Sequence, residues 1–223
     1  MHAEHVRIWI GFEMSFTLQN FHLQSFIAAT LSEDLGPTGR DITSESVIPS
    51  DVHFAGVMDS RDPIVVAGLP IAAAFFKHLD SDMDIDILAA EGQQVAAGTD
   101  LMRLTGRARA MLTAERSALN TVQHLSGIAT LTRKYVDAIE GTGCTLLDTR
   151  KTIPGLRVLE KYATRMGGAT NHRMGLWDAA MIKDNHVAVA GNVEEAVRRA
   201  KDAGVARIIL EVDHISQIEP GLA

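Results

Sequence analysis

The second half of the chain alternates short apolar runs with helical patterns, and this alternation restricts the fold more than any other feature. The apolar runs have the length of short strands and lie at residues 144–147, 169–171, 179–182 and 206–210. Apolar residues at helical spacing occupy 156–166 and 193–202 between them. Strands joined through helices run parallel, because parallel neighbours need a crossover connection. The rhythm therefore favours an α/β barrel or an open doubly wound sheet.

The first half predicts a smaller α+β domain. Strand-like runs lie at residues 53–58, 63–67, 84–89 and 100–104. Helices are expected within 20–35 and at 69–79. The Gly, Pro, Thr and Ser content of residues 36–49 predicts a loop between the first helix and the first strand.

A long helical pattern joins the two halves. It covers residues 108–140, and Gly127 inside it predicts a break into two helices. We expect an N-terminal domain over 16–116 and a second domain over 117–223. Residues 1–15 carry no clear pattern.

Composition excludes several classes of protein. The net charge of −7 argues against a nucleic-acid binder that works by bulk charge. Since no apolar run approaches the length of a membrane span, we expect no membrane partner. Cys144 is the single cysteine, which excludes an internal disulfide and a cysteine-based zinc site. A reducing compartment, the cytoplasm, is the expected location.

Ionisable residues follow each of the four apolar runs directly. In order along the chain they are Arg150 and Lys151, His172 and Arg173, Lys183, and Glu211 with Asp213. The C-terminal ends of parallel strands meet at one edge, where ligands bind. A single polar strand end is ordinary, but four in succession, mostly cationic, favour a binding site. Several cations at one edge of an acidic chain suit a ligand with several phosphates or carboxylates.

Carboxylates at this edge are candidates for holding a divalent metal. They are Asp148, Asp184, Glu211 and Asp213. A magnesium ion that arrives on a phosphate substrate needs few protein ligands. The chain has no P-loop, no dinucleotide-binding glycine pattern, no hydrolase nucleophile elbow and no HExxH zinc motif. Cys144, inside an apolar run, is predicted to be a small core residue, and His186 suits a ligand contact or a structural hydrogen bond about equally.

Six segments occur in an order that matches a known family. They are Thr113–Asn120, Leu125–Thr130, Asp148–Thr152, Asn171–Arg173, Ile182–His186 and Glu211–Asp213. The pattern resembles the quinolinate phosphoribosyltransferase family, and Glu33–Gly36 and Asp41–Thr43 resemble its N-terminal region. The resemblance runs from about residue 20 to the last residue.

The resemblance implies a fold and a reaction. The fold is an N-terminal α/β sandwich domain followed by an incomplete, TIM-like α/β barrel. Family members are homodimers or multiples of dimers, in which the N-terminal domain of one subunit covers the barrel mouth of the other. The implied reaction joins quinolinate to phosphoribosyl pyrophosphate with Mg²⁺. It yields nicotinate mononucleotide, pyrophosphate and CO₂ for NAD biosynthesis.

The resemblance also implies roles for individual residues. Arg116 would reach into the partner subunit's site. The two carboxylates of quinolinate would be held by Arg150, His172, Arg173 and Lys183. The phosphates would meet Lys151, shared with Lys183, and Glu211 would lie near the ribose and, indirectly, the Mg²⁺. The implied catalytic residues are Lys151, Lys183 and Glu211.

The chain departs from the family at its C-terminal end. Family members continue beyond Ala223 with a further aspartate, the glycine-rich loops for the 5′-phosphate and the last barrel strands. We therefore expect the barrel to be cut short here, and the chain alone not to be catalytically competent.

Three alternatives remain open. One is a ModD-like paralogue that uses a different base, although Arg116, Arg150, His172 and Arg173 together favour a dicarboxylate. A second is a Schiff-base enzyme with a lysine nucleophile. The third is a non-catalytic anion-binding module.

Overall fold

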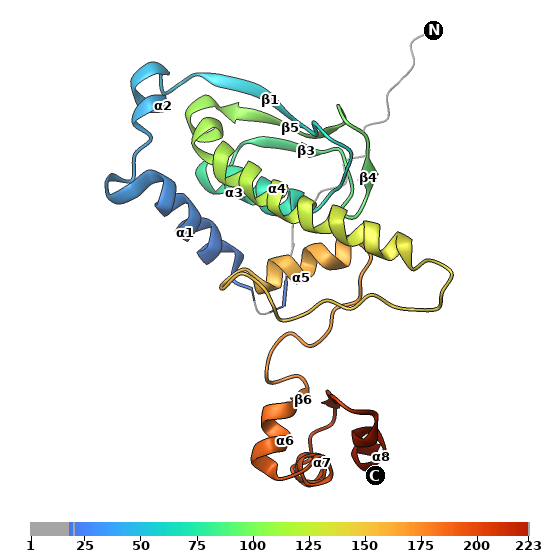
Figure 1. The fold of residues 1–223 in the computed structure, drawn as a ribbon. Coiled ribbons are helices and arrows are strands. Elements are labelled where there is room, and N and C mark those ends of the chain that lie inside the picture. Colours follow the sequence, from blue (N-terminus) through green and yellow to red (C-terminus); the bar gives the residue numbers. More distant parts are fainter. Residues whose placement is uncertain (1–17, 20, 223) are drawn as a thin grey trace. The chain divides into compact units, whose positions relative to one another are not determined.

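The computed structural model describes residues 18, 19 and 21–222, which form two compact units (Figure 1). The first unit contains the described residues up to Leu146 together with Val158–Ala169. The second unit contains Leu147–Arg157 and the described residues from Thr170 onward. Residues 1–15, which carry no pattern in the sequence, lie outside the described residues. Within the described part no helix is long and apolar enough to span a bilayer.

The first unit is built around a three-stranded antiparallel sheet. Its order is β1 (His53–Asp59), β5 (Asp100–Arg107) and β3 (Asp84–Ile87). Ile85 and Ile87 alternate with exposed aspartates, as the sequence predicts for a sheet with one face in water. A second, two-stranded sheet pairs β2 (Ile64–Val65) with β4 (Gln94–Val95).

Helices cover one side of this sheet. Figure 1 shows α3 (Leu69–Leu79) and α4 (Ala108–Ala138) beside each other there. α3 has the predicted bounds, and its buried side chains include Phe75 and Phe76. α1 (Leu23–Leu35) lies within the predicted range, and its Phe26 ring packs edge-on against Phe75.

The predicted break in the long helix is wrong. α4 is one helix of 31 residues that starts directly after β5. A glycine inside a helix costs only about 1 kcal/mol relative to alanine. The buried face of α4, which includes Ala118, Leu125 and Ala129, offsets that cost by packing across Gly127. The expected domain boundary between 116 and 117 falls within this helix and stays a prediction.

The predicted loop over 36–49 is also wrong, because it contains a short helical turn, η1 (Gly36–Thr38), and α2 (Ile42–Val47). Asp41 caps α2: its Oδ1 accepts hydrogen bonds from the backbone N–H groups of Thr43 at 3.1 Å and Ser44 at 3.0 Å. Its Oδ2 accepts one from the Thr113 hydroxyl on α4 at 3.0 Å. The Ser44 hydroxyl also donates to Oδ2, at 2.5 Å. This bond makes the largest contribution to holding the pKa of Asp41 below its usual value, and the backbone N–H of Ser44 makes the next largest.

α5 (Arg157–Met166) contributes to the first unit from Val158 onward. Its buried Tyr162 donates a hydrogen bond to the carboxylate of Glu91. The same carboxylate accepts the backbone N–H groups of Gly68 at 2.7 Å and Leu69 at 2.9 Å, at the start of α3. Burial raises the pKa of Glu91, against the effect of these three donors.

α5 ends where the chain passes very close to α4. An added Cβ at Gly167 would lie 2.5 Å from the carbonyl oxygen of Ala129 and 2.5 Å from Cβ of Thr132. Only a residue without a side chain fits there, since an interior packs at crystal-like density.

The second unit has the parallel strands that the sequence predicts. β6 (Ala180–Ile182) pairs in parallel with β7 (Ile208–Leu210). The helices that follow along the chain are α6 (Asp184–Ala190), α7 (Val193–Asp202), the short η2 (Ile215–Gln217) and α8 (Ile218–Leu222). Ile182, Ala196 and Val197 form a small apolar core, with Leu210 packed against it. The mixed α/β fold class is confirmed.

Two of the four predicted strands are reduced to one pair of residues. Leu147 and Thr170 form an isolated parallel bridge. The backbone N–H groups nearby bond elsewhere: Cys144 donates to the Thr142 hydroxyl at 3.2 Å, and Ala169 donates to the carbonyl of Thr164 at 3.1 Å. A ladder cannot extend through groups already engaged. Cys144 is exposed, so its prediction as a core residue is wrong.

Candidate substrate site

The candidate site residues of the second unit lie just after its parallel pairs. Ile182 and Leu210 are paired in register, so the next residues along each strand, Lys183 and Glu211, are neighbours. Lys183 Nζ lies 3.0 Å from Glu211 Oε2, and the Glu211 N–H donates to the carbonyl of Ile182 at 2.9 Å. About half of each side chain is exposed to solvent. The pair is therefore accessible to a ligand and nearly neutral as a whole.

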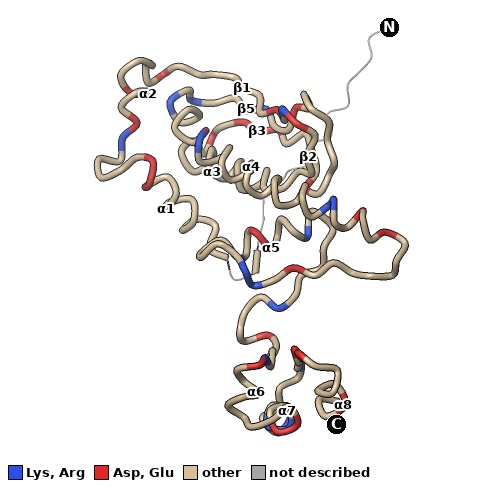
Figure 2. Tube along the Cα trace, viewed as in Figure 1, with Lys and Arg blue, Asp and Glu red and all other residues tan. Residues whose placement is uncertain are grey.

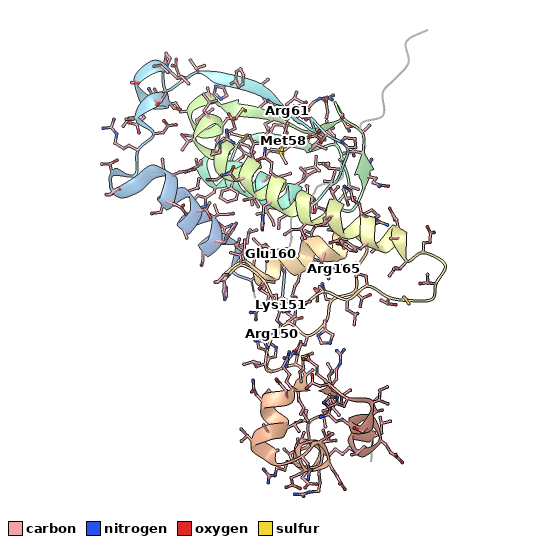
Figure 3. The ribbon with its side chains drawn as sticks, in the orientation of Figure 1. Met58, Arg61, Arg150, Lys151, Glu160 and Arg165 are labelled. Atoms are coloured by element: carbon pink, nitrogen blue, oxygen red, sulfur yellow. The ribbon has the colours of Figure 1, made fainter. Side chains whose placement is uncertain are left out.

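The Leu147–Thr170 bridge likewise brings together the two segments that follow its two residues. Arg150 and Lys151 follow Leu147, and His172 and Arg173 follow Thr170. Figure 3 labels Arg150 and Lys151 on their segment. The sequence assigned all of these residues to one site, and within the second unit the fold brings them near one another as two adjacent segments.

Asp148 connects these two segments through its carboxylate. Oδ1 accepts the backbone N–H of His172 at 2.7 Å, and Oδ2 accepts Nδ2 of Asn171 at 2.7 Å. The sequence suggested Asp148 only as a metal candidate. The structure instead gives this side chain hydrogen-bond donors, which hold one segment against the other.

The arginines of the site differ in how they are held. Arg173 is buried, and its Nη1 donates to the carbonyl of Ala179 at 3.0 Å. Nε of Arg150 is buried and has no hydrogen-bond partner. A buried guanidinium nitrogen without a partner is costly, and an anion bound beside it would remove that cost. Lys151 is exposed.

A second carboxylate, that of Asp178, holds the turn that follows Arg173 through hydrogen bonds. Asp178 accepts the backbone N–H groups of Met174 at 2.6 Å and Gly175 at 3.4 Å. These donors, with the charge of Arg173 as a smaller contribution, hold the pKa of Asp178 below its usual value. Asp178 therefore stays ionised and keeps this turn fixed.

Carboxylates that could hold a metal ion are scattered in this site. Among the described residues, no group of three or more His, Cys, Asp or Glu side chains converges as a metal site. Figure 2 marks the positions of basic and acidic residues along the described chain. Glu211, the carboxylate assigned to an indirect metal contact, has Lys183 as its ion-pair partner. This donor set fits an ion carried mainly by a substrate better than one caged by the protein.

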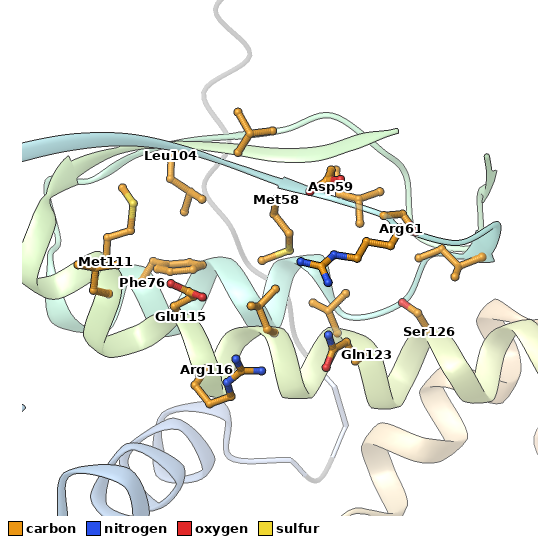
Figure 4. A pocket seen from close by; sticks show the side chains of 18 of the residues that line it. Met58, Asp59, Arg61, Phe76, Leu104, Met111, Glu115, Arg116, Gln123 and Ser126 are labelled. Atoms are coloured by element: carbon orange, nitrogen blue, oxygen red, sulfur yellow. The ribbon is translucent and has the colours of Figure 1, made fainter. Parts of the chain in front are cut away.

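Arg116 belongs to the first unit, whereas the residues described above belong to the second. It lines a pocket of about 750 Å³ beside α4, together with Glu115, Gln123 and Arg61 (Figure 4). Apolar side chains also line it, among them Phe54, which is 51% exposed. Arg61 follows β1 and Arg116 lies on α4, so the two arginines reach the pocket from different elements, and Glu115 adds a carboxylate. An open pocket with both charges and apolar side chains suits a mixed polar and apolar surface of another molecule.

The comparisons with known proteins identify the family. The family profile described as the quinolinate phosphoribosyl transferase C-terminal domain matches residues 128–222, and that of the N-terminal domain matches 41–126. The nicotinate-nucleotide pyrophosphorylase [carboxylating] of Mycobacterium leprae is 43% identical over 200 residues, which cover 88% of this chain and 70% of that protein. The chain belongs to the quinolinate phosphoribosyltransferase family.

Further relatives support the fold and show how much of the family's length this chain covers. The crystal structure of NadC from Streptococcus pyogenes is 34% identical, with a TM-score of 0.87, and the match covers 93% of this chain and 73% of that one. A Synechocystis relative named "Probable nicotinate-nucleotide pyrophosphorylase [carboxylating]" is 48% identical over 161 residues. The match spans 55% of that relative's length, so the chain corresponds to only part of it.

One residue near the candidate substrate site was not predicted from the sequence. Arg157 begins α5, and its guanidinium donates to the hydroxyl of Thr152 and to the carbonyl of Met174, each at 3.2 Å. In the sequence Arg157 stands at the start of a helical pattern, where a charged side chain is ordinary and indicates no special role. The only available signal was its place shortly after Asp148–Thr152.

Proposed function

We propose that this protein transfers the phosphoribosyl group of phosphoribosyl pyrophosphate to quinolinate. The products are nicotinate mononucleotide, pyrophosphate and CO₂, in the biosynthesis of NAD. The proposal is supported by the family and by the names of the relatives. The observation that carries it is the Asp148 link, which holds the segment with Arg150 and Lys151 against the segment with His172 and Arg173.

These residues suit the two anionic substrates. Quinolinate carries two adjacent carboxylates, and we assign them to Arg150, His172, Arg173 and Lys183. The buried, unpartnered Nε of Arg150 supports this assignment, because a carboxylate there would satisfy it. We assign the phosphates to Lys151, a compact exposed charge, shared with Lys183.

The chemistry needs charge stabilisation more than proton transfer. The pyridine nitrogen of quinolinate attacks C1 of the ribose, and the bond from C1 to the pyrophosphate oxygen breaks. Lysines 151 and 183 stabilise the leaving pyrophosphate, and the Glu211 carboxylate stabilises positive charge on the sugar. Mg²⁺ bound to the phosphates would supply further stabilisation of the leaving group, with Glu211 as an indirect contact. The carboxylate next to the ring nitrogen then leaves as CO₂, and the electron pair that it leaves on the ring carbon is stabilised by the positively charged ring until that carbon takes up a proton from water.

We also propose a homodimer, or a multiple of dimers, in which Arg116 acts in the partner's site. The open pocket around Arg116 in the first unit supports this assignment. The test mixes an Arg116→Ala protein with a Lys151→Ala protein. If sites are shared, one site of each mixed dimer is intact and activity returns. No recovery in verified mixed dimers would refute a shared site.

The decisive experiment is detection of nicotinate mononucleotide by mass spectrometry. Purified protein is incubated with quinolinate, phosphoribosyl pyrophosphate and Mg²⁺, and quinolinate binding is measured in parallel. Product that requires both substrates would support the reaction. Binding without turnover is the result expected if the chain alone is not catalytically competent, and neither binding nor product would refute the proposal.

Two controls separate the other candidates. Turnover of a different base would identify a ModD-like paralogue. Borohydride trapping of a carbonyl substrate on Lys151 or Lys183 would identify a Schiff-base enzyme. We propose the cytoplasm as the compartment, because the single, exposed Cys144 suits a reducing environment.

A further inference from the structure

Two segments of the second unit carry four of the basic residues that we assign to the substrates. The first cationic segment is Asp148–Arg157, which contains Arg150 and Lys151, and the second cationic segment is Thr170–Met174, which contains His172 and Arg173. Their backbones share one parallel bridge, Leu147–Thr170, with a hydrogen bond from the Asp148 N–H to the Thr170 carbonyl at 3.2 Å. A single bridge fixes one point of contact and leaves the direction of the two segments free. Side chains must therefore set their spacing.

Asp148 supplies the first of these side-chain links. Its two oxygens accept from different groups of the second segment, Nδ2 of Asn171 and the backbone N–H of His172, both at 2.7 Å. Two bonds to two atoms restrain rotation as well as distance. Hydrogen bonds to an ionised carboxylate are also stronger than neutral ones. The position of His172 relative to the first segment is thus held through its own backbone.

Arg157 supplies the second link, at the other end of the segments. Its Nε donates to the Thr152 hydroxyl and its Nη1 donates to the Met174 carbonyl, both at 3.2 Å. The Thr152 hydroxyl in turn donates to the carbonyl of Arg150 at 3.5 Å. A guanidinium presents its donors in a rigid plane, which suits a bridge between two acceptors. Arg150 and Arg173 therefore lie on segments that are tied at both ends.

We propose that Asp148 and Arg157 are positioning residues for a dicarboxylate. They hold the two cationic segments in one frame, so that both adjacent carboxylates of the substrate are met at once. Neither residue needs to touch the substrate. The inference rests on the proposed function. It explains in addition why the site would bind a ligand with two carboxylates in preference to a ligand with one. A preorganised pair of cationic segments binds a rigid dianion without the cost of ordering them.

The test compares two inhibitors that cannot react. Benzene-1,2-dicarboxylate has both carboxylates but no ring nitrogen, and benzoate has one carboxylate. In Asp148→Ala and Arg157→Lys we expect the dicarboxylate to bind about tenfold more weakly or worse, since charge-assisted bonds are lost. We expect benzoate binding to change by less than about threefold, because one segment suffices to hold it. The ratio of the two affinities is the readout, which a general loss of stability does not move.

Two matched controls lie in the same unit. Asn192→Ala removes the side chain that caps α7, where Oδ1 accepts the Glu195 N–H at 2.8 Å. Arg198→Lys removes a guanidinium that is ion-paired on the surface of α7. Both changes are expected to leave the affinity ratio as in the unmodified protein. Asp148→Asn keeps a carbonyl oxygen for the His172 N–H, so a folded variant with an intermediate ratio is expected if Asp148→Ala does not fold.

The outcomes separate this inference from the proposed function. If the unmodified protein turns over quinolinate and every variant keeps its affinity ratio, the positioning role is wrong and the function stands. If the unmodified protein neither binds the dicarboxylate nor forms product, the proposed function itself is wrong. A ratio that falls in both link variants and stays constant in both controls supports the inference.

Discussion

Tyr162→Phe gives a sharp test of how the first unit is held together. The hydroxyl of Tyr162 on α5 donates to the Glu91 carboxylate, which also accepts two N–H groups at the start of α3. The substitution removes one donor and almost no volume. At a pH where Glu91 is ionised, loss of a hydrogen bond to a charged group should lower the free energy of unfolding by about 1.5–3 kcal/mol.

The pH dependence of this loss follows from the pKa of Glu91. Burial raises the pKa of Glu91 in the folded protein. The folded state therefore binds a proton on Glu91 more tightly than the unfolded state does, and protonation stabilises the fold. The contribution of Glu91 to stability is therefore fully present below the unfolded pKa of about 4.3, and is lost as the pH rises through its raised folded pKa. Tyr162→Phe removes a donor that favours the ionised form, so it raises this pKa further. When Glu91 is protonated, the missing bond is neutral and costs only about 0.5–1.5 kcal/mol.

The assay is urea denaturation at about pH 4 and about pH 8. A shift of the unfolding midpoint with an unchanged m-value gives the change in the free energy of unfolding. The chain has two tyrosines, and the other, Tyr135, is 60% exposed on α4. Tyr135→Phe is the matched control and should change the unfolding free energy by less than about 0.5 kcal/mol. An equal loss for Tyr162→Phe at both pH values, or a loss no larger than the control's, would refute the role given to Glu91.

Four other changes have defined outcomes. Gly167→Ala should lower the unfolding free energy by about 1–3 kcal/mol through overpacking. Gly127→Ala, where an added Cβ meets nothing, should raise it by up to about 1 kcal/mol. Asp41→Ala should cost about 1–2 kcal/mol in urea denaturation at neutral pH. The pKa of Asp41 is lowered in the folded protein. The contribution of its carboxylate to the free energy of unfolding is therefore present above about pH 3.9, the pKa of an unfolded aspartate, and disappears as the pH falls through the folded pKa. Glu211→Gln should lower kcat/KM at least about tenfold, and should change stability by less than about 1 kcal/mol because its ion pair with Lys183 is exposed.

The sequence predicted the elements that have a long or regular pattern. α3 and α7 have the predicted bounds, and β6 and β7 lie within the predicted runs. These segments bury one face, so their periodicity is visible. α2 has only six residues and was missed, because so short a helix shows no period and its Asp41 cap looks like part of a turn.

The candidate site was only partly predictable. The position of Lys183 beside Glu211 follows from parallel strands in register, a rule that needs no side-chain detail. The link from Asp148 to His172 joins residues 24 apart in the chain through a backbone group. No local pattern reports such a contact, because it depends on how two irregular segments pack. The same holds for Arg157, whose partners Thr152 and Met174 lie on separate segments.

The continuous α4 helix has a consequence for how this protein can change in length. Each residue of an α-helix turns the following side chains by about 100°. Inserting or deleting one residue near the start of α4 would swing Arg116 out of the pocket it lines, or else turn Ala118 and Leu125 away from the core. The number of residues between Ala108 and Ala138 is therefore fixed by the pocket and by the core. The turn at Gly141–Gly143 is exposed, so a change of length there would displace no buried side chain.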